Sequence, residues 1–232
     1  MDKLTLEQIK EGQVLLFDKP LNWTSFQVVN KVRWLIKQKF KLKKIKVGHA
    51  GTLDPLATGL VILCTGKATK TIESLMGQTK VYTGEFTLGA TTPSYDMETE
   101  IDERFEIDHI DHDLIEETIK QFQGEIMQQP PVFSALKKEG KRLYEYARKG
   151  EKVDIPMRKV KIDHFMITRF NLPQLEFKVK CSKGTYIRSL AHDFGKSLSS
   201  GAYLSGLRRT QIGDYNVDDA FSIEDFEKLL ND

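Results

Sequence analysis

The chain has 232 residues, enough to bury the core of one large domain or two small ones. Its hydrophobic fraction of 40% and charged fraction of 29% are ordinary for a soluble globular protein. No apolar run approaches the roughly 20 residues that cross a bilayer, and the amino-terminal residues lack the basic-then-apolar order of a secretory signal. We therefore expect a cytoplasmic protein that does not act at a membrane.

The cysteines and histidines argue against a disulfide-bonded protein and against a metal-binding one. Cys64 and Cys181 both lie in apolar, strand-like stretches, so we expect buried free thiols rather than a disulfide. The one close histidine pair, His109 and His112, has no cysteine beside it. The sequence predicts no metal site.

The formal net charge of +2 conceals strong segregation along the chain. Basic residues outnumber acidic ones by 14 to 6 in residues 1–80 and by 18 to 8 in residues 121–210. Acidic residues dominate by 12 to 2 in residues 81–120 and by 7 to 1 in residues 211–232. This pattern predicts a basic face built from two separate stretches, which suits a polyanion. The alternative is an ordinary solvated surface.

The first third of the chain alternates strands and helices. Residues 12–17 predict a strand, and Thr24-Ser25 can cap a helix whose apolar residues recur at helical spacing. Residues 37–46 hold six lysines interleaved with apolar residues, which predicts an edge strand or a loop that buries one side. Residues 60–64 predict a buried strand, followed by a short helix over 67–76 with Gly77 just past its end.

The middle of the chain begins with an alternating strand over residues 80–88, with Tyr82 and Phe86 on one face. Residues 91–113 are polar and acidic, which predicts a long loop. A helix follows, with Ile115 and Ile119 on its apolar face.

The last part begins with an irregular basic insertion over residues 128–155, in which one short helix ends at Gly150. Residues 160–170 and 175–181 predict a hairpin, Thr185 opens a helix, and Ser222 caps a final one. Strands and helices mix without strict βαβ alternation. The pattern therefore predicts an α+β fold around a large mixed sheet.

One loop, from Gly48 to Gly59, carries an isolated carboxylate. Asp54 precedes a proline, which bars helical geometry at Asp54 and holds it extended, and three glycines surround it. A carboxylate held rigidly at the edge of a strand suits a nucleophile or a base. Asp-Pro and Gly are also ordinary turn residues, so a plain turn is the alternative.

Several short motifs follow one another along the chain, and it is their combination and order that are informative. They are Asp18-Lys19-Pro20, Thr24-Ser25, Gly48 to Gly59, Gly66-Lys67-Ala68-Thr69-Lys70, Tyr82, Pro130 to Lys137, Gly140 to Arg148, Cys181 to Arg188 and Leu207-Arg208-Arg209. With them the chain resembles the TruB family of tRNA pseudouridine synthases, which isomerise the uridine at position 55 in the TΨC loop. The resemblance implies a pseudouridine synthase-like fold, with a mostly antiparallel sheet flanked by helices, in a single catalytic domain over residues 1–232.

The resemblance also assigns the chemistry. Asp54 either attacks the sugar covalently or removes a ribose proton, and Arg188 pairs with it and keeps it ionised. Tyr82 stacks on the flipped-out base and helps to move its C5 proton. From the sequence alone, a core aromatic is the commoner fate for a strand tyrosine such as Tyr82, and Arg188 fits a surface arginine equally well.

Five further residues are implied to bind substrate. Tyr186 lines the base pocket, Leu207 closes it, and His49 enters the RNA loop to hold the space left by the flipped base. Lys19 and Pro20 are structural supports or phosphate contacts near the active site.

The basic stretches are expected to grip tRNA. Residues 37–46 and the insertion at 128–155 should hold backbone phosphates of the T-arm stem-loop, and the insertion should fold over it. The isomerisation requires no cofactor or metal, and we expect a monomer. The family's carboxy-terminal PUA domain is not expected here, and Asn22 stands where the family has a glycine, in a turn that asparagine tolerates.

Two other function classes compete with this assignment. A tRNA-binding and refolding module would show the same basic surfaces without needing Asp54, Tyr82 and Arg188 together. A glycoside hydrolase also uses a carboxylate at an anomeric carbon, but it needs a second acidic partner, and none is evident near the basic motifs.

Overall fold

The computed structural model describes residues 4–138, 140–151 and 153–231. Residues 139 and 152 of the predicted insertion therefore lie outside the described part of the chain. Contacts between Cα atoms divide the chain into two compact units. The first unit contains Met1–Tyr82 and Leu207–Asp232, and the second contains Thr83–Gly206. The single catalytic domain over residues 1–232 stays a prediction.

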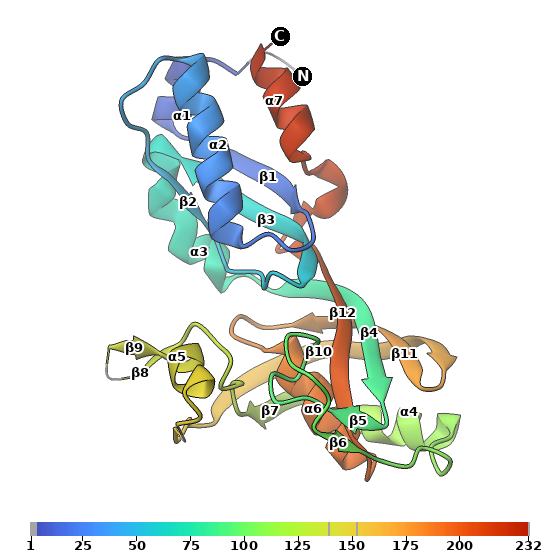
Figure 1. Ribbon diagram of the computed structural model, residues 1–232. Coiled ribbons are helices and arrows are strands. Elements are labelled where there is room, and N and C mark those ends of the chain that lie inside the picture. The colour runs from blue at the N-terminus through green and yellow to red at the C-terminus, as the bar shows by residue number, and fades with distance from the viewer. Residues whose placement is uncertain (1–3, 139, 152, 232) are drawn as a thin grey trace. The chain divides into compact units, whose positions relative to one another are not determined.

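The first unit packs helices against a small mixed sheet (Figure 1). Its helices are α1 Leu6–Glu11, α2 Ser25–Lys39, η1 Gly66–Thr71, α3 Ile72–Gly77, η2 Val217–Asp219 and α7 Ile223–Asn231. Its strands are β1 Val14–Lys19, β2 Val47–His49, β3 Ala57–Thr65 and β13 Tyr215–Asn216. Two longer strands, β4 Lys80–Leu88 and β12 Ala202–Ile212, have residues in both units.

Strand β3 organises the first unit. It pairs antiparallel with β1 and β2 and parallel with β12, where Leu207 lies opposite Ala57. A buried cluster that includes Leu60, Ile62 and Ile212 forms the core beneath this sheet. The predicted strands at 12–17 and 60–64 are confirmed, with shifted ends.

Helix α2 begins where the sequence predicts. Thr24 Oγ1 accepts a hydrogen bond from the Gln27 amide at 3.1 Å, and the Gln27 side chain accepts one from the Thr24 amide at 2.7 Å. This capping box satisfies two free amides of the first turn. The helix buries the predicted apolar residues, Val28, Val29, Val32, Leu35 and Ile36.

Two local predictions in this unit were wrong. Helix α2 continues to Lys39, so the start of the lysine-rich stretch 37–46 is helical, which suits the good helix propensity of lysine. The predicted helix over 67–76 is two pieces, η1 and α3. Gly77 is the last residue of α3 rather than a residue past its end, and Gln78 forms the cap.

The second unit is a mostly antiparallel sheet with helices α4 His112–Gln121, α5 Leu143–Arg148 and α6 Ile187–Ser197 (Figure 1). Its own strands are β5 Ala90–Thr91, β6 Glu103–Arg104, β7 Gly124–Gln128, β8 Lys137–Lys138, β9 Lys141–Arg142, β10 Arg158–Asn171 and β11 Gln174–Cys181. The hydrogen-bonded order is β12-β4-β11-β10-β7. Phe86 stacks on Phe177 at 4.2 Å, and Phe194 of α6 lies 5.5 Å from Phe165, so aromatic rings fill the space between α6 and the sheet.

The predicted hairpin, the helices near residues 115 and 143, and the α+β class with a mixed, mostly antiparallel sheet are confirmed. The acidic loop 91–113 contains the small β5–β6 pair, which was not predicted. Helix α6 begins at Ile187 rather than at Thr185, with Tyr186 as its N-cap. Ser222 caps α7 through the Asp225 amide, as predicted.

Both cysteines are free and buried. Across the described ranges, every helix is too short or too polar to span a membrane.

Candidate active site

The Asp54 loop, residues 50–56 between β2 and β3, is held by hydrogen bonds on both sides of the carboxylate. The hydroxyl of Ser25 accepts from the Leu53 amide at 2.8 Å and lies 3.2 Å from the Leu53 carbonyl oxygen, to which it donates. The Asn22 amide donates to the Pro55 carbonyl at 2.9 Å. Asn22 has φ of 64°, so it adopts the left-handed turn expected where the family has glycine. Asp54, half-buried, therefore stands on a backbone with little freedom.

Lys19 supports the same loop from within the protein. Its side chain is fully buried, and Nζ donates to the carbonyls of Pro20 at 2.9 Å, Trp23 at 2.6 Å and Pro55 at 3.3 Å. Burial lowers the pKa of Lys19 to about 8, and the nearby charge of Asp54 opposes that decrease. Because three carbonyls take its donors, the geometry favours the structural support over the phosphate contact.

Arg209 is a second buried cation, on β12, and sequence reasoning gave it no role. It is 2% exposed, and its guanidinium donates to the carbonyls of Leu60 at 2.8 Å, Thr52 at 3.3 Å and Gly51 at 3.2 Å. These contacts tie the start of the Asp54 loop, at Gly51 and Thr52, to Leu60 of β3. The only signal in the sequence was its place in the Leu207-Arg208-Arg209 motif.

Gly59 makes room for Arg209. The two residues are partners in the parallel β3–β12 ladder, and a Cβ atom at Gly59 would lie 2.3 Å from the Arg209 carbonyl oxygen. Gly59 also has φ of 104°, which only glycine adopts readily. A glycine is therefore required at position 59, because β3 and β12 approach each other too closely there for any side chain.

The other predicted residues of the first unit lie on the surrounding strands. His49 ends β2, is half-buried, and has its pKa lowered mainly by burial, so its ring is neutral at pH 7. Tyr82 on β4 is buried. Leu207 on β12 is half-buried opposite Ala57, which immediately follows the Asp54 loop.

In the second unit, Arg188 lies in the first turn of α6 and is 4% exposed. Its Nη1 donates to the Phe133 carbonyl at 2.9 Å and lies 3.5 Å from Oδ2 of Asp96, which is also buried. A buried guanidinium needs such partners, so a surface location for Arg188 is wrong. The predicted pairing of Arg188 with Asp54 stays a prediction. Asp96 was missed because nothing distinguishes it in the sequence from the other carboxylates of the acidic stretch.

Tyr186 is fixed at the N-cap of α6. The side chain of Gln128, fully buried at the end of β7, accepts from the Tyr186 amide at 2.8 Å and donates to its carbonyl at 3.0 Å. The Arg158 guanidinium lies 4.5 Å from the centre of the Tyr186 ring and donates to the Gly184 carbonyl. A half-buried aromatic ring with a fixed main chain and a guanidinium near its ring suits the wall of a pocket.

The predicted basic insertion carries exposed cations and aromatic rings. The guanidinium groups of Arg142 and Arg148 lie 6.0 and 5.4 Å from the centre of the Tyr144 ring on α5. Lys141 lies 5.9 Å from the ring of Tyr146. Exposed cations beside aromatic rings are typical of surfaces that bind nucleic acid.

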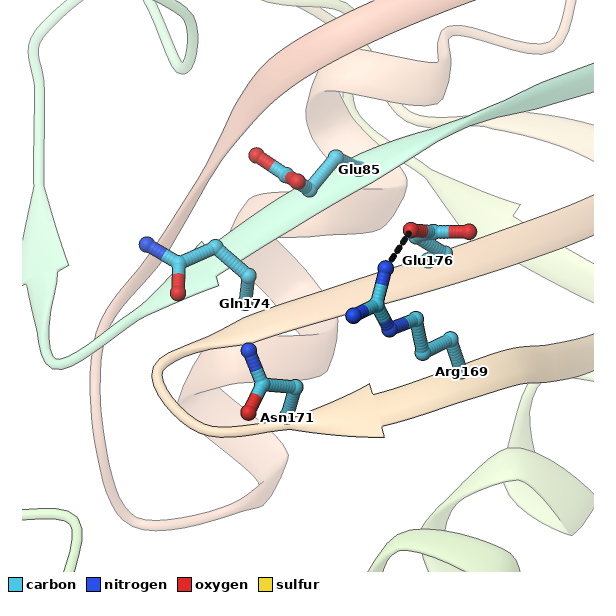
Figure 2. Close-up of a pocket in the computed structure, with 5 residues that line it drawn as sticks. All are labelled: Glu85, Arg169, Asn171, Gln174 and Glu176. Atoms are coloured by element: carbon cyan, nitrogen blue, oxygen red, sulfur yellow. Dashed lines mark hydrogen bonds and ion pairs between the residues drawn. The ribbon is translucent and has the colours of Figure 1, made fainter.

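A polar groove of about 250 Å³ lies elsewhere in this unit, along β4, β10 and β11 (Figure 2). It is lined by Glu85, Arg169, Asn171, Gln174 and Glu176. Arg169 and Glu176 form an ion pair at 3.3 Å, and Glu85 accepts from the Ser205 hydroxyl at 2.7 Å. Its charged groups already have partners in the protein, and it contains none of the residues implied to act on substrate.

Comparison with known proteins identifies the family. The model described as TruB family pseudouridylate synthase (N terminal domain) matches residues 37–187, and the tRNA pseudouridylate synthase B C-terminal domain model matches residues 188–232. A Flavobacterium johnsoniae protein named tRNA pseudouridine synthase B is 61% identical over 98% of this chain and 100% of its own length. A Phocaeicola vulgatus protein of the same name is 55% identical over 96% and 94%.

A solved structure gives the same result. One chain of the "Crystal Structure of a Cbf5-Nop10-Gar1 Complex" superposes with a TM-score of 0.71 at 30% identity, covering 96% of this chain and 55% of that one. This chain therefore spans about half the length of that structural neighbour. From the matched models and the full-length relatives, the chain belongs to the TruB family of pseudouridylate synthases.

Proposed function

We propose that this protein converts the uridine at position 55 of tRNA to pseudouridine, with Asp54 as the catalytic carboxylate. The observation that carries the proposal is the Asp54 loop, which Ser25, Lys19 and Arg209 hold by hydrogen bonds to its backbone. The relatives of 61% and 55% identity, both named tRNA pseudouridine synthase B, support tRNA as the substrate.

The reaction rearranges the atoms of one nucleoside. The N1–C1′ bond breaks, the uracil turns, a C5–C1′ bond forms, and the proton on C5 is replaced by one on N1. No electrons are gained or lost, so neither an oxidant nor a reductant takes part. Asp54 either bonds to the sugar and is later displaced, or removes a ribose proton to give a glycal. Both routes need an ionised carboxylate held at the sugar.

The remaining residues recognise the base and orient the acid. We propose that Tyr82 stacks on the uracil, a contact of about 1–3 kcal/mol that offsets the cost of extruding the nucleotide. Tyr186 and Leu207 form the pocket walls, and His49 fills the gap in the RNA loop. Arg188 stabilises the Asp54 carboxylate, and Asp96 orients the Arg188 guanidinium through their buried contact.

The basic segments grip the T-arm stem-loop. Residues 40–46 follow α2, and Lys137, Lys141, Arg142 and Lys149 of the insertion are exposed. Exposed lysines and arginines bind phosphates by releasing counterions, so affinity falls as salt rises. We further propose a cytoplasmic monomer, which the buried free thiols suit.

The test is tritium release from a tRNA transcript labelled at uracil C5. We expect release from the wild-type transcript and none when cytidine replaces uridine 55. Asp54→Asn should abolish release, whereas Asp108→Asn, an exposed carboxylate in the second unit, should match the wild type. Release by Asp54→Asn at the wild-type rate would refute the assignment of Asp54 as the catalytic carboxylate.

A further inference from the structure

Tyr95, the residue next to Asp96, has an unusual backbone. Its φ is 63°, in the left-handed region that aromatic residues rarely adopt. Residues held in this region are unfavourable by themselves and persist only where their surroundings fix them. The contacts that fix Tyr95 therefore indicate what its conformation is for.

Main-chain contacts hold the segment that carries Tyr95, the 92–99 turn. The Tyr95 amide donates to the Thr92 carbonyl at 3.1 Å, and the Thr92 hydroxyl donates to the Asp96 carbonyl at 2.7 Å. The Leu204 amide of β12 donates to the Tyr95 carbonyl at 3.0 Å. These bonds set the backbone of the turn, and within it the Glu98 amide donates to Oδ1 of Asp96 at 2.9 Å.

The Tyr95 side chain packs on helix α6. Its ring stacks on the imidazole of His192 with centroids 3.9 Å apart and an angle of 16° between the planes. His192 follows Arg188 by four residues, so both lie on the same face of α6, one turn apart. Two successive residues of the turn thus contact two successive turns of the helix: Tyr95 on His192, and Asp96 on Arg188.

The chemistry of the stack fits this arrangement. Burial lowers the pKa of His192, and the nearby charge of Lys196 lowers it further, so the imidazole is neutral at pH 7. A neutral ring packs face to face with tyrosine without having to be desolvated as a cation. The Tyr95 ring thus holds the turn on α6 beside the ion pair.

We propose that Tyr95 and His192 are positioning residues for the isomerisation: their stack holds the 92–99 turn on α6, so that the Asp96 carboxylate stays against the Arg188 guanidinium. Neither residue touches the substrate. The expected effect on the reaction rate rests on the proposed function, in which Arg188 acts on Asp54. The stack between Tyr95 and His192 does not depend on that function. A small displacement of a catalytic group can slow a reaction by up to about a hundredfold.

The experiment distinguishes the effect of losing the Tyr95 ring from the effect of changing the strained backbone at that position. Tyr95→Asn removes the ring and keeps a residue that tolerates left-handed geometry, while Tyr95→Phe keeps the ring. The proposal expects Tyr95→Asn to lower the single-turnover rate of tritium release at least tenfold with tRNA affinity within twofold of wild type. Tyr95→Phe should stay within twofold in both. A Tyr95→Asn enzyme as fast as wild type, or one whose loss lies in affinity, overturns the proposal.

The partner ring supplies a second test. His192→Leu keeps an apolar side chain but loses the ring stack. Its single-turnover rate should therefore fall at least tenfold, with tRNA affinity within twofold of wild type. The double variant with Tyr95→Asn should be no more than twofold slower than the slower single variant, because the two rings act as one unit. Losses that multiply would contradict the proposal. If Tyr95→Asn shows no cooperative melting transition, His192→Leu decides, and an unchanged rate refutes the stack.

Thermal melting keeps this test independent of the RNA chemistry. Tyr95→Asn and Asp96→Asn should be coupled in a double-mutant cycle of melting temperatures, since both loosen the same turn. Additive shifts would refute the stack's role in holding Asp96 even in a protein that isomerises tRNA. Coupled shifts in a protein that releases no tritium would support the contact and refute only the proposed function.

Discussion

Lys19 gives a prediction that depends on pH with a fixed sign. Its pKa falls from 10.5 to about 8 in the folded protein because burial disfavours the ammonium. The unfolded chain, with the ordinary value, therefore binds more protons between pH 8 and 10.5. Stability contributed by this residue rises with pH across that window and is constant below it.

The magnitude follows from the displaced pKa. A decrease from 10.5 to about 8 means that the charge on Lys19 opposes folding by about 3 kcal/mol at pH 7. By pH 9.5 about 1 kcal/mol of that opposition remains. Lys19→Met removes the titration and leaves three carbonyls without their donor. That loss destabilises the variant by an amount that does not change with pH.

The assay compares urea unfolding of the wild type and Lys19→Met at pH 7, 8, 9 and 9.5. The wild type should gain about 2 kcal/mol relative to the variant between pH 7 and 9.5. Lys149→Met, at an exposed lysine, should show a constant difference and serves as the control. A constant difference for Lys19→Met, or one that moves the other way, would refute the account of a buried ammonium beneath the Asp54 loop.

Three further predictions concern the same loop and the RNA-binding surface. Gly59→Ala should lower the free energy of unfolding in urea by about 3 kcal/mol or more, because the added Cβ would meet the backbone of β12. The control is Gly124→Ala, also at positive φ but in open space, which should lower it by about 1 kcal/mol. Equal losses would contradict the close approach of β3 and β12 at Gly59. Ser25→Ala should cost about 1–3 kcal/mol and lower kcat more than it raises KM, and a change in KM alone would argue against its hold on Asp54. Lys141→Gln and Lys149→Gln should each reduce the slope of log Kd against log salt by about 1, and an unchanged slope would exclude that lysine from a phosphate contact.

Local signals in the sequence predicted much of the fold. Thr24 and Gln27 specify the start of α2 by themselves, because a capping box is complete within four residues. The clean alternation of residues 175–181 likewise predicted β11. Strand β12 was missed because its side chains do not alternate strictly between buried and exposed. Strand β7 does alternate, but it has only five residues and its most buried side chain is the polar Gln128, so no apolar pattern marks it. The helix end beyond Lys37 was misjudged because lysines are compatible with helix, strand edge and loop.

The candidate site was predictable only where a motif carried it. Asp54 stood out through its proline and glycines, and its loop is as constrained as that pattern predicts. Arg209 and Asp96 were not found, because their partners lie more than ninety residues away in the sequence and no local pattern reports such contacts. Buried charges of this kind become visible only when the fold brings their partners together.

The most direct test of the central claim is the single-turnover rate of Asp54→Asn on tRNA labelled at uracil C5, measured beside its affinity for the same tRNA. We expect the rate to fall at least a thousandfold while the Kd stays within threefold, because the amide keeps the shape of the side chain but can neither attack the sugar nor accept its proton. A rate within tenfold of wild type would contradict a catalytic role for this carboxylate.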